Sequence, residues 1–189
     1  MKKSALFGTV TAFALAASGA MAAEGDTLKE VKARGVLNCG VNTGLVGFAA
    51  PDANGNWSGF DVAFCKAMAA AVLGDATKVK FVPTTGQTRF TALSSGEVDI
   101  LARNSTWTFQ RDTDLKLDFI GVNYYDGQGF MVRKDLGVSS AKELDGATIC
   151  IQTGTTTELN LADYFKANNM TYQPVNIDSN AEGEQQYME

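Results

Sequence analysis

The hydrophobic and polar positions of the chain follow two alternating patterns, one typical of strands and one typical of helices. Short apolar runs predict strands at residues 36–41, 78–83, 98–102, 117–120, 129–133, 147–152 and 172–176. Apolar positions three and four apart predict helices at residues 26–34, 61–73, 87–95, 141–144 and 155–168. Because strands alternate with helical segments, the pattern predicts βαβ units and mostly parallel sheets.

The alternation starts again near residues 124–135, which predicts two α/β lobes. We expect lobe one at residues 23–128 and the start of lobe two at residues 129–189. After the last predicted strand only a polar segment remains, residues 178–189, with no closing strand and no cap. About 60 residues are too few for a sheet covered on both faces. The sequence therefore predicts an incomplete second lobe and a truncated chain.

The first 22 residues have the pattern of a cleavable signal peptide. Lys2 and Lys3 precede an apolar stretch, residues 5–17, and the small residues Ala20-Met21-Ala22 follow it. This order is that of a secretory signal cleaved after Ala22. The apolar stretch is too short to span a bilayer, and no later stretch predicts a membrane span. We therefore expect an exported protein without a direct membrane anchor.

Charge and composition exclude several classes of function. Without Lys2 and Lys3, 14 basic residues stand against 21 acidic ones, a net charge of −7. Such a chain is a poor candidate for binding nucleic acid or an anionic membrane surface. The sequence has no histidine and no C-x-x-C pair, which removes the commonest ligands of a zinc site. No metal and no cofactor is expected.

The three cysteines fit an oxidising compartment. Cys39 lies on the first predicted strand and Cys65 on the first long predicted helix. If strand and helix pack together, a disulfide between Cys39 and Cys65 is possible, with two buried thiols as the alternative. Cys150 is left over, and an odd cysteine in an exported protein calls for a partner that this sequence does not contain.

Small hydrogen-bonding residues follow the strand predicted at residues 98–102. Asn104 and Thr106 lie just past its carboxyl end, where open α/β sheets bind ligands. Arg111 ends the stretch, and a guanidinium can donate two parallel hydrogen bonds to a carboxylate. The stretch therefore predicts a site for a small carboxylate-bearing ligand. The alternative is a polar loop with a solvated arginine.

A second candidate site lies where the helix predicted at residues 155–168 begins. Thr155 and Glu158 have the spacing of a capping box. The free amides and partial positive charge of a helix start attract an anion, with ordinary capping as the alternative. No lysine follows Gly154 as a phosphate-binding P-loop would require.

Four motifs together resemble one protein family. They are G-F-D-V-A-F at residues 59–64, R-N-S-T-W-T at 103–108 with Arg111, Y-Y-D-G-Q-G-F-M-V at 124–132, and G-T-T-T-E at 154–158. In this order they resemble the periplasmic solute-binding proteins of ABC transporters for polar amino acids. They are most similar to the general and the glutamate/glutamine/aspartate/asparagine-binding members. Ala63 departs from the family pattern, in which an acid is usual.

The resemblance implies a fold and a function. The fold is the α/β clamshell of the type II periplasmic binding proteins, with two lobes that close by a hinge motion on a ligand. The ligand is a free polar L-amino acid, namely glutamate, glutamine, aspartate or asparagine, which is delivered to an ABC permease. Binding without catalysis, a periplasmic location and a monomer are the family's usual properties.

The resemblance also assigns residues to the ligand. Those of lobe one are Arg103, Asn104, Thr106 and Arg111, and those of lobe two are Thr155 and Thr156. Arg111 would bind the α-carboxylate with two hydrogen bonds. Arg89 matches an arginine aimed at an acidic ligand side chain, with a surface arginine on a short helix as the alternative. Gly86 lies where relatives often carry a serine. No residue matches the acid that binds the ligand ammonium.

Three other interpretations fit the same fold. A periplasmic enzyme, such as a cyclohexadienyl or arogenate dehydratase, would need an acid or base in the cleft, and Asp61, Glu97 and Asp99 are predicted at helix starts or on the surface. The ligand-sensing domain of a receptor would need a membrane span. A broken chain without function would be unstable to proteolysis.

Overall fold

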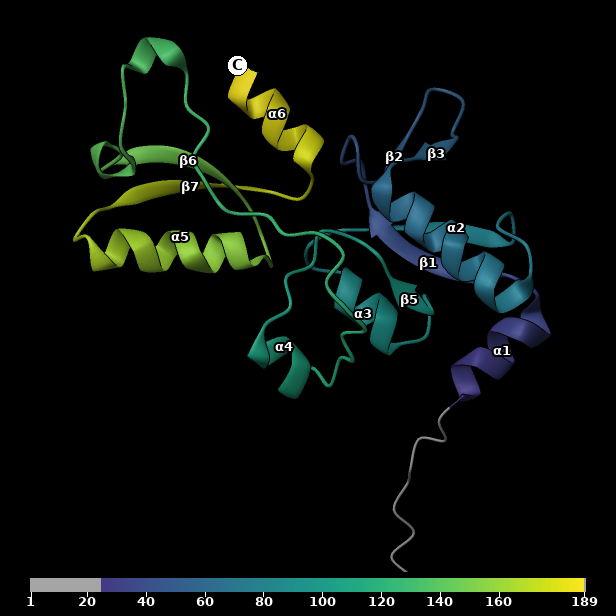
Figure 1. The fold of residues 1–189 in the computed structure, drawn as a ribbon. Helices are drawn as coiled ribbons and strands as arrows, with labels where there is room; N and C mark the ends of the chain where they lie inside the picture. The colour runs from purple at the N-terminus through teal and green to yellow at the C-terminus, as the bar shows by residue number, and fades with distance from the viewer. Residues whose placement is uncertain (1–24, 189) are drawn as a thin grey trace, which may run out of the picture.

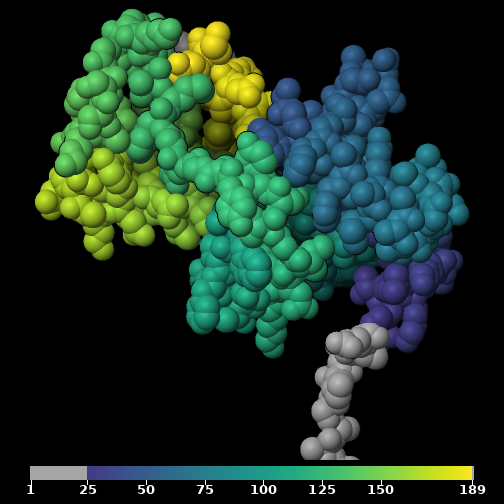
Figure 2. Space-filling view, in the orientation of Figure 1, coloured from purple at the N-terminus to yellow at the C-terminus, as the bar shows by residue number. Residues whose placement is uncertain are grey.

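The computed structural model describes residues 25–188 and arranges them in two lobes, each built around a parallel sheet (Figure 1). The two lobes form separate masses joined by the chain between them (Figure 2). The α/β class and the two-lobe arrangement predicted from the pattern are confirmed. The predicted signal peptide, residues 1–22, lies outside the described residues. Within residues 25–188, no helix has both the length and the hydropathy needed to cross a membrane.

The first lobe contains a three-stranded parallel sheet in the order β4-β1-β5. Its strands are β1 (Leu37–Asn42), β4 (Val79–Thr84) and β5 (Ile100–Leu101). Its helices are α1 (Asp26–Arg34), α2 (Phe60–Leu73), α3 (Arg89–Ser94) and α4 (Phe109–Thr113). A short antiparallel hairpin of β2 (Ala50–Pro51) and β3 (Trp57–Ser58) lies between β1 and α2. The central strand β1 is buried almost throughout, as expected for a strand with neighbours on both sides.

Helix α2 covers one face of this sheet and carries much of the core. Val62, Cys65 and Ala69 point inward from it. Gly59 begins the helix with a φ of 123°, and a side chain there would collide with the backbone of Phe48. Glycine is therefore the residue that allows the loop of residues 43–49 to approach the helix start so closely.

A disulfide joins α2 to the sheet beneath it. Cys39 of β1 and Cys65 of α2 are both fully buried and bonded to each other, with their Cα atoms 6.1 Å apart. The bond closes a loop across 26 residues of sequence, a length for which a disulfide stabilises the folded state by on the order of 3 kcal/mol. Cys150, on β6 of the second lobe, is free and exposed.

The second lobe contains two parallel strands with a helix on each face. β6 (Ala147–Gln152) pairs with β7 (Tyr172–Ile177). Helix α5 (Thr156–Ala167) packs on one side, and α6 (Asn180–Met188) lies on the other (Figure 1). Two single turns, η1 (Lys134–Leu136) and η2 (Ala141–Glu143), precede β6. The core of this lobe is formed by Leu144, Ile151, Leu161 and Phe165.

Helix α6 corrects the prediction that residues 178–189 form only a polar segment without a cap. The helix start is capped from both directions. Ser179 Oγ accepts a hydrogen bond from Glu182 N at 3.2 Å, and Glu182 Oε2 accepts one from Asp178 N at 2.8 Å. The sequence S-N-A-E carries this capping-box signal, so the helix was predictable from spacing although it has no apolar face.

The strands predicted at residues 117–120 and 129–133 are wrong. Neither segment pairs with a strand, and both belong to the connection between the two sheets. A strand exists only where a neighbour accepts and donates its backbone hydrogen bonds. Among the described residues no strand lies beside either segment, so a short apolar run alone did not suffice. Several apolar side chains of this connection are exposed, among them Ile120, Tyr125 and Met131.

Candidate functional site

The turns that follow β4, β5 and β6 meet where the two lobes touch. The Oγ1 atoms of Thr106 and Thr156 lie 3.0 Å apart, and Arg89 Nη2 donates to Gly154 O at 3.1 Å. Each of these turns follows the carboxyl end of a parallel strand, the usual position of ligand sites in open α/β sheets. The structure therefore brings together the candidate residues of lobe one and lobe two that the sequence separates by about fifty positions.

Three arginines are buried at this meeting point. Arg89, Arg103 and Arg111 are 2%, 7% and 8% exposed. Within residues 25–188, none of them forms an ion pair with a carboxylate. A buried ionised group is costly unless it is paired. The cluster therefore holds positive charge that an anion would stabilise.

Arg89 begins α3 and spans the two lobes. Its Nη1 donates to Ser105 Oγ at 3.2 Å in the first lobe, and its Nη2 donates to Gly154 O in the second. Its guanidinium carbon lies 4.6 Å from the centre of the Phe90 ring, and its Nε is buried without a hydrogen-bond partner. The alternative that Arg89 is a surface arginine is wrong.

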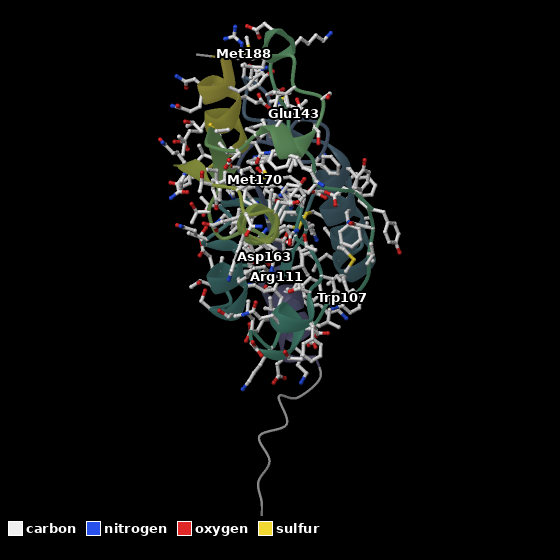
Figure 3. The ribbon with its side chains drawn as sticks, turned by 90° about the vertical axis from the view of Figure 1, so that its left-hand side faces the viewer. Trp107, Arg111, Glu143, Asp163, Met170 and Met188 are labelled. Atoms are coloured by element: carbon white, nitrogen blue, oxygen red, sulfur yellow. A yellow bond between two sulfur atoms is a disulfide. The ribbon has the colours of Figure 1, made fainter. Side chains whose placement is uncertain are left out.

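Arg111 lies in α4, a short helix that the apolar pattern did not predict. Thr108 caps this helix by accepting a hydrogen bond from Arg111 N at 3.2 Å. Arg111 Nη1 donates to Thr106 O at 2.7 Å, and its guanidinium lies 4.9 Å from the Phe90 ring centre. In the view of Figure 3, Arg111 lies near the middle of the lower part of the molecule and Trp107 nearer its margin. The remaining donors of Arg111 have no acceptor among the described side chains and backbone.

Arg103 uses its donors within the first lobe. Its Nη1 donates to Thr84 O at 2.6 Å and Thr85 O at 2.8 Å, and its Nη2 donates to Asn104 Oδ1 at 3.2 Å. It therefore ties the turn after β4 to the turn after β5. A direct contact between Arg103 and a ligand stays a prediction, and the geometry favours a positioning role instead.

The electrostatic environment of the cluster follows from burial and from mutual repulsion. Burial, with Arg103 and Arg111 nearby, lowers the pKa of Arg89 to about 9. Burial likewise lowers the pKa of Arg103 to about 10, although Asp61 counteracts this effect. Burial also lowers the pKa of Arg111. A bound carboxylate would favour the charged form of all three guanidiniums and oppose these shifts.

Asp61 is the carboxylate that interacts electrostatically with this cluster. It lies in the first turn of α2, is 3% exposed, and has one carboxylate oxygen without a hydrogen-bond partner. Burial raises its pKa, and Arg103 partly offsets this effect. One buried acid beside three buried arginines leaves the site positive.

Asn42 is a site residue that the sequence analysis missed. It ends β1, is fully buried, and donates from Nδ2 to Asn104 Oδ1 at 2.9 Å. Asn104 Oδ1 thus accepts from both Asn42 and Arg103, so its orientation is set within the first lobe. The sequence did contain a signal for Asn42, because it is a polar residue at the end of a strand that was predicted to be buried.

The start of α5 lies across the lobe contact from these residues. Thr155 Oγ1 accepts from Glu158 N at 3.1 Å and donates to Gln152 O at 2.7 Å. Glu158 Oε2 accepts from Gly154 N at 2.8 Å. The capping predicted from the sequence is present. The other backbone N–H groups in the first turn of α5 have no hydrogen-bond acceptor within the helix, as at any helix start. They are therefore available to an anion.

A cavity of about 740 Å³ lies between α3, β5 and residues 115–123. Phe90, Leu101 and Phe119 contribute to its lining, and Arg103 and Ser105 reach its edge. Most of the lining residues of this cavity are apolar, whereas those at the lobe contact are polar or cationic.

A two-lobed α/β fold with polar and cationic residues at the lobe contact defines a class of ligand-binding proteins. Residues 37–180 match the family model of the bacterial extracellular solute-binding proteins, family 3, and the chain belongs to this family. The family predicted from the four sequence motifs is therefore confirmed.

Two curated relatives are similar over nearly the whole chain. The glutamate/glutamine/aspartate/asparagine-binding protein of Rhodobacter capsulatus is 74% identical over 187 residues, which is 99% of this chain and 54% of that protein. The general L-amino acid-binding periplasmic protein of Rhizobium johnstonii is 64% identical over 173 residues, which is 92% of this chain and 51% of that protein. The chain thus spans about half the length of the curated relatives it matches.

Solved structures show the same fold. A periplasmic binding protein from Brucella ovis with glutathione bound is 60% identical, with a TM-score of 0.81 over 86% of this chain and 51% of that one. The cysteine-binding protein of Campylobacter jejuni is 30% identical, with a TM-score of 0.70 over 86% of this chain and 63% of that one. The fold is that of the type II periplasmic binding proteins, as expected.

Proposed function

We propose that this chain binds a polar L-amino acid outside the cytoplasm and delivers it to an ABC permease. Glutamate, glutamine, aspartate and asparagine are the proposed ligands. The observation that carries the proposal is the cluster of buried arginines Arg89, Arg103 and Arg111, for which the described residues provide no ion-pair partner. An amino acid brings the missing carboxylate, and an acidic amino acid brings two.

Four of the candidate residues have a proposed role in contacting the ligand. Arg111 binds the α-carboxylate through the donors that the protein leaves free, and Thr106 adds a hydroxyl from the same lobe. Thr156 and the first-turn amides of α5 bind the same carboxylate from the second lobe. Arg89 lies within reach of both lobes and binds the ligand side chain. A guanidinium prefers a carboxylate but also donates to an amide oxygen, which accommodates both acids and amides.

Closure follows from the same contacts. The ligand stabilises the closed state because it binds residues of both lobes there and of only one lobe in the open state. The proposed division is residues 23–128 for lobe one and 129–189 for lobe two. We propose that the protein is periplasmic, monomeric and not an enzyme. The relatives named above are binding proteins, and the site consists of hydrogen-bond donors with a single buried acid, Asp61.

The first experiment is a thermal-melt panel. The chain is exported by its own signal sequence, purified from the periplasm and melted with each of the twenty L-amino acids. At a hundred times the dissociation constant a ligand stabilises its protein by about 2.7 kcal/mol, which raises the melting temperature of a chain of this size by roughly 5–10 °C. We expect this rise with one or more of glutamate, glutamine, aspartate and asparagine. D-Glutamate and L-lysine are the matched controls, and a melt that no amino acid shifts would contradict the proposal.

A further inference from the structure

Two glycines face each other across the lobe contact. A Cβ atom on Gly86, in the turn after β4, would lie 2.5 Å from Thr153 O and 3.3 Å from Thr155 Cγ2. A Cβ atom on Gly154 would lie 3.1 Å from Gly86 O. The two turns are therefore as close as their backbones allow, and any side chain at position 86 would hold them apart.

Polar contacts between the lobes lie directly beside this glycine contact. The hydrogen bond from Arg89 to Gly154 O involves one of the two glycines, and the hydroxyls of Thr106 and Thr156 meet nearby. Hydrogen bonds lose their strength steeply as donor and acceptor separate. A shift of about one ångström between the turns would break these contacts while leaving each lobe intact.

We propose that Gly86 sets how closely the two lobes approach and thereby the size of ligand that the closed cleft accepts. With glycine at this position, the turn at residues 153–155 packs against the turn after β4. Residues of both lobes can then contact the same small ligand. A bulkier residue would hold the cleft wider and penalise short ligands more than long ones. The ligand-size part rests on the proposed function, whereas the lobe approach does not.

Gly86 is the better of the two glycines for a test. Gly154 has a φ of +75°, so any substitution there also strains the backbone. Gly86 has no φ in the left-handed region, and the atoms that a side chain would meet all belong to the second lobe. Replacing Gly86 by alanine therefore adds a clash between lobes without straining the first lobe.

The test measures the distance between the lobes with and without saturating glutamate, because the ligand favours the closed state in which the two turns meet. Cys150, exposed and free on β6, takes one spin label. The substitution Ala76→Cys provides the second, because Ala76 is exposed between α2 and β4, at the end of the sheet away from the lobe contact. The buried Cys39–Cys65 disulfide does not react. We expect the short, closed-state pulsed-EPR distances in Gly86→Ala to shift to longer values than in the labelled parent.

Gly44→Ala is the matched control. A Cβ on Gly44 meets nothing within 4 Å, and its φ lies outside the left-handed region, so its distance distribution should equal that of the parent. A distribution unchanged by Gly86→Ala would overturn the proposal. So would a Gly86→Ala protein that loses its cooperative melt while Gly44→Ala keeps it, because the glycine would then serve the folding of the first lobe.

Affinity provides the second measurement. Gly86→Ala should weaken the binding of aspartate about tenfold, the usual effect of one overpacked contact, and weaken glutamate less. Equal losses for both would overturn the size argument, whereas the distance measurement would still decide the lobe approach. If no amino acid binds even the parent chain, the proposed function fails and the distance result stands by itself.

Discussion

Arg89 of the first lobe donates a hydrogen bond from Nη2 to the backbone carbonyl of Gly154 in the second lobe, over 3.1 Å. The same guanidinium donates from Nη1 to Ser105 Oγ. One side chain from α3 therefore links the turn after β5 to the turn after β6. Its planar, branched group is what allows two separate acceptors to be served at once.

Replacing Arg89 by lysine tests this double role. A lysine ammonium is a single point charge that cannot reproduce the guanidinium geometry. We expect glutamate binding to weaken about tenfold or more, and glutamine binding less, because a charged hydrogen bond is worth more than a neutral one. Calorimetric titration of both ligands measures the difference. Arg133→Lys, at an exposed arginine paired with Asp135, should change neither affinity, and equal losses in Arg89→Lys would show that Arg89 serves only the lobe contact.

Arg111→Met should separate binding from stability. Loss of the arginine proposed for the α-carboxylate should weaken every amino-acid ligand by about 100-fold, since removing one partner of a buried hydrogen-bonded charge pair costs about 2–5 kcal/mol. Without ligand the same change removes a buried, unpaired charge whose burial already lowers its pKa. The ligand-free melting temperature should therefore stay the same or rise. A variant that melts lower and binds normally would assign Arg111 to the fold instead.

The pH dependence of stability should reveal Asp61. Burial raises its pKa in the folded state above the ordinary 3.8, so the unfolded chain loses this proton first as pH rises. Stability contributed by the protonated form is present below pH 3.8 and is lost as pH rises toward the folded-state pKa. We expect Asp61→Asn to melt like the parent near pH 3.5 and a few degrees higher at pH 7.

Asp52 provides a control of opposite sign. Hydrogen bonds from Asn56 lower its pKa, so its contribution is present above pH 3.8 and is lost as pH falls. Asp52→Asn should therefore be less stable than the parent at pH 7, and the difference should shrink in acid. Melting curves of both variants at pH 3.5, 5.5 and 7 measure the two trends. If Asp61→Asn were instead less stable than the parent at pH 7, as expected for Asp52→Asn, the attraction of Arg103 for the Asp61 carboxylate would outweigh the cost of burying it.

Removing the disulfide between Cys39 and Cys65 should lower the stability of the protein, and removing the free Cys150 is the control. The double change Cys39→Ser and Cys65→Ser should lower the free energy of unfolding by on the order of 3 kcal/mol, because the loop that the bond closes is released in the unfolded chain. Denaturant titration measures the loss. Cys150→Ser should leave stability within about 0.5 kcal/mol of the parent, since Cys150 is exposed and free. A double variant as stable as the parent would contradict the disulfide's role.

Thr155 and Thr157 form a matched pair at the start of α5. Thr155→Ala removes the side-chain acceptor for Glu158 N and should cost about 1 kcal/mol. Thr157 is exposed, and within residues 25–188 its side chain forms no hydrogen bond, so Thr157→Ala should be close to neutral. If the two variants lost equal stability, the observed cap would not be the cause. Thermal melts of both variants without ligand provide the comparison.

The sequence by itself determined the α/β class, the restart of the pattern that marks two lobes, and the bounds of most regular elements to within two residues. It did so because these features depend on local periodicity and on end signals. Strand β6 and helix α1 lie where the pattern predicts them, at Ala147–Gln152 and Asp26–Arg34. The four motifs also led to the correct family. Local signals missed α4, β2, β3 and the single turn η1, which are too short to show a period, and α6, which has a cap but no apolar face.

Tertiary structure alone decided which polar residues share a site. Arg89, Arg111 and Gly154 are far apart in the sequence, and no spacing rule shows that the first two lie against the same Phe90 ring or that the first contacts the third. The same holds for the segments at 117–120 and 129–133, whose short apolar runs predict strands that the structure does not form. Strand pairing, burial of charge and the approach of Gly86 to Thr153 all depend on neighbours brought in from elsewhere in the chain, and a one-dimensional pattern contains no record of those neighbours.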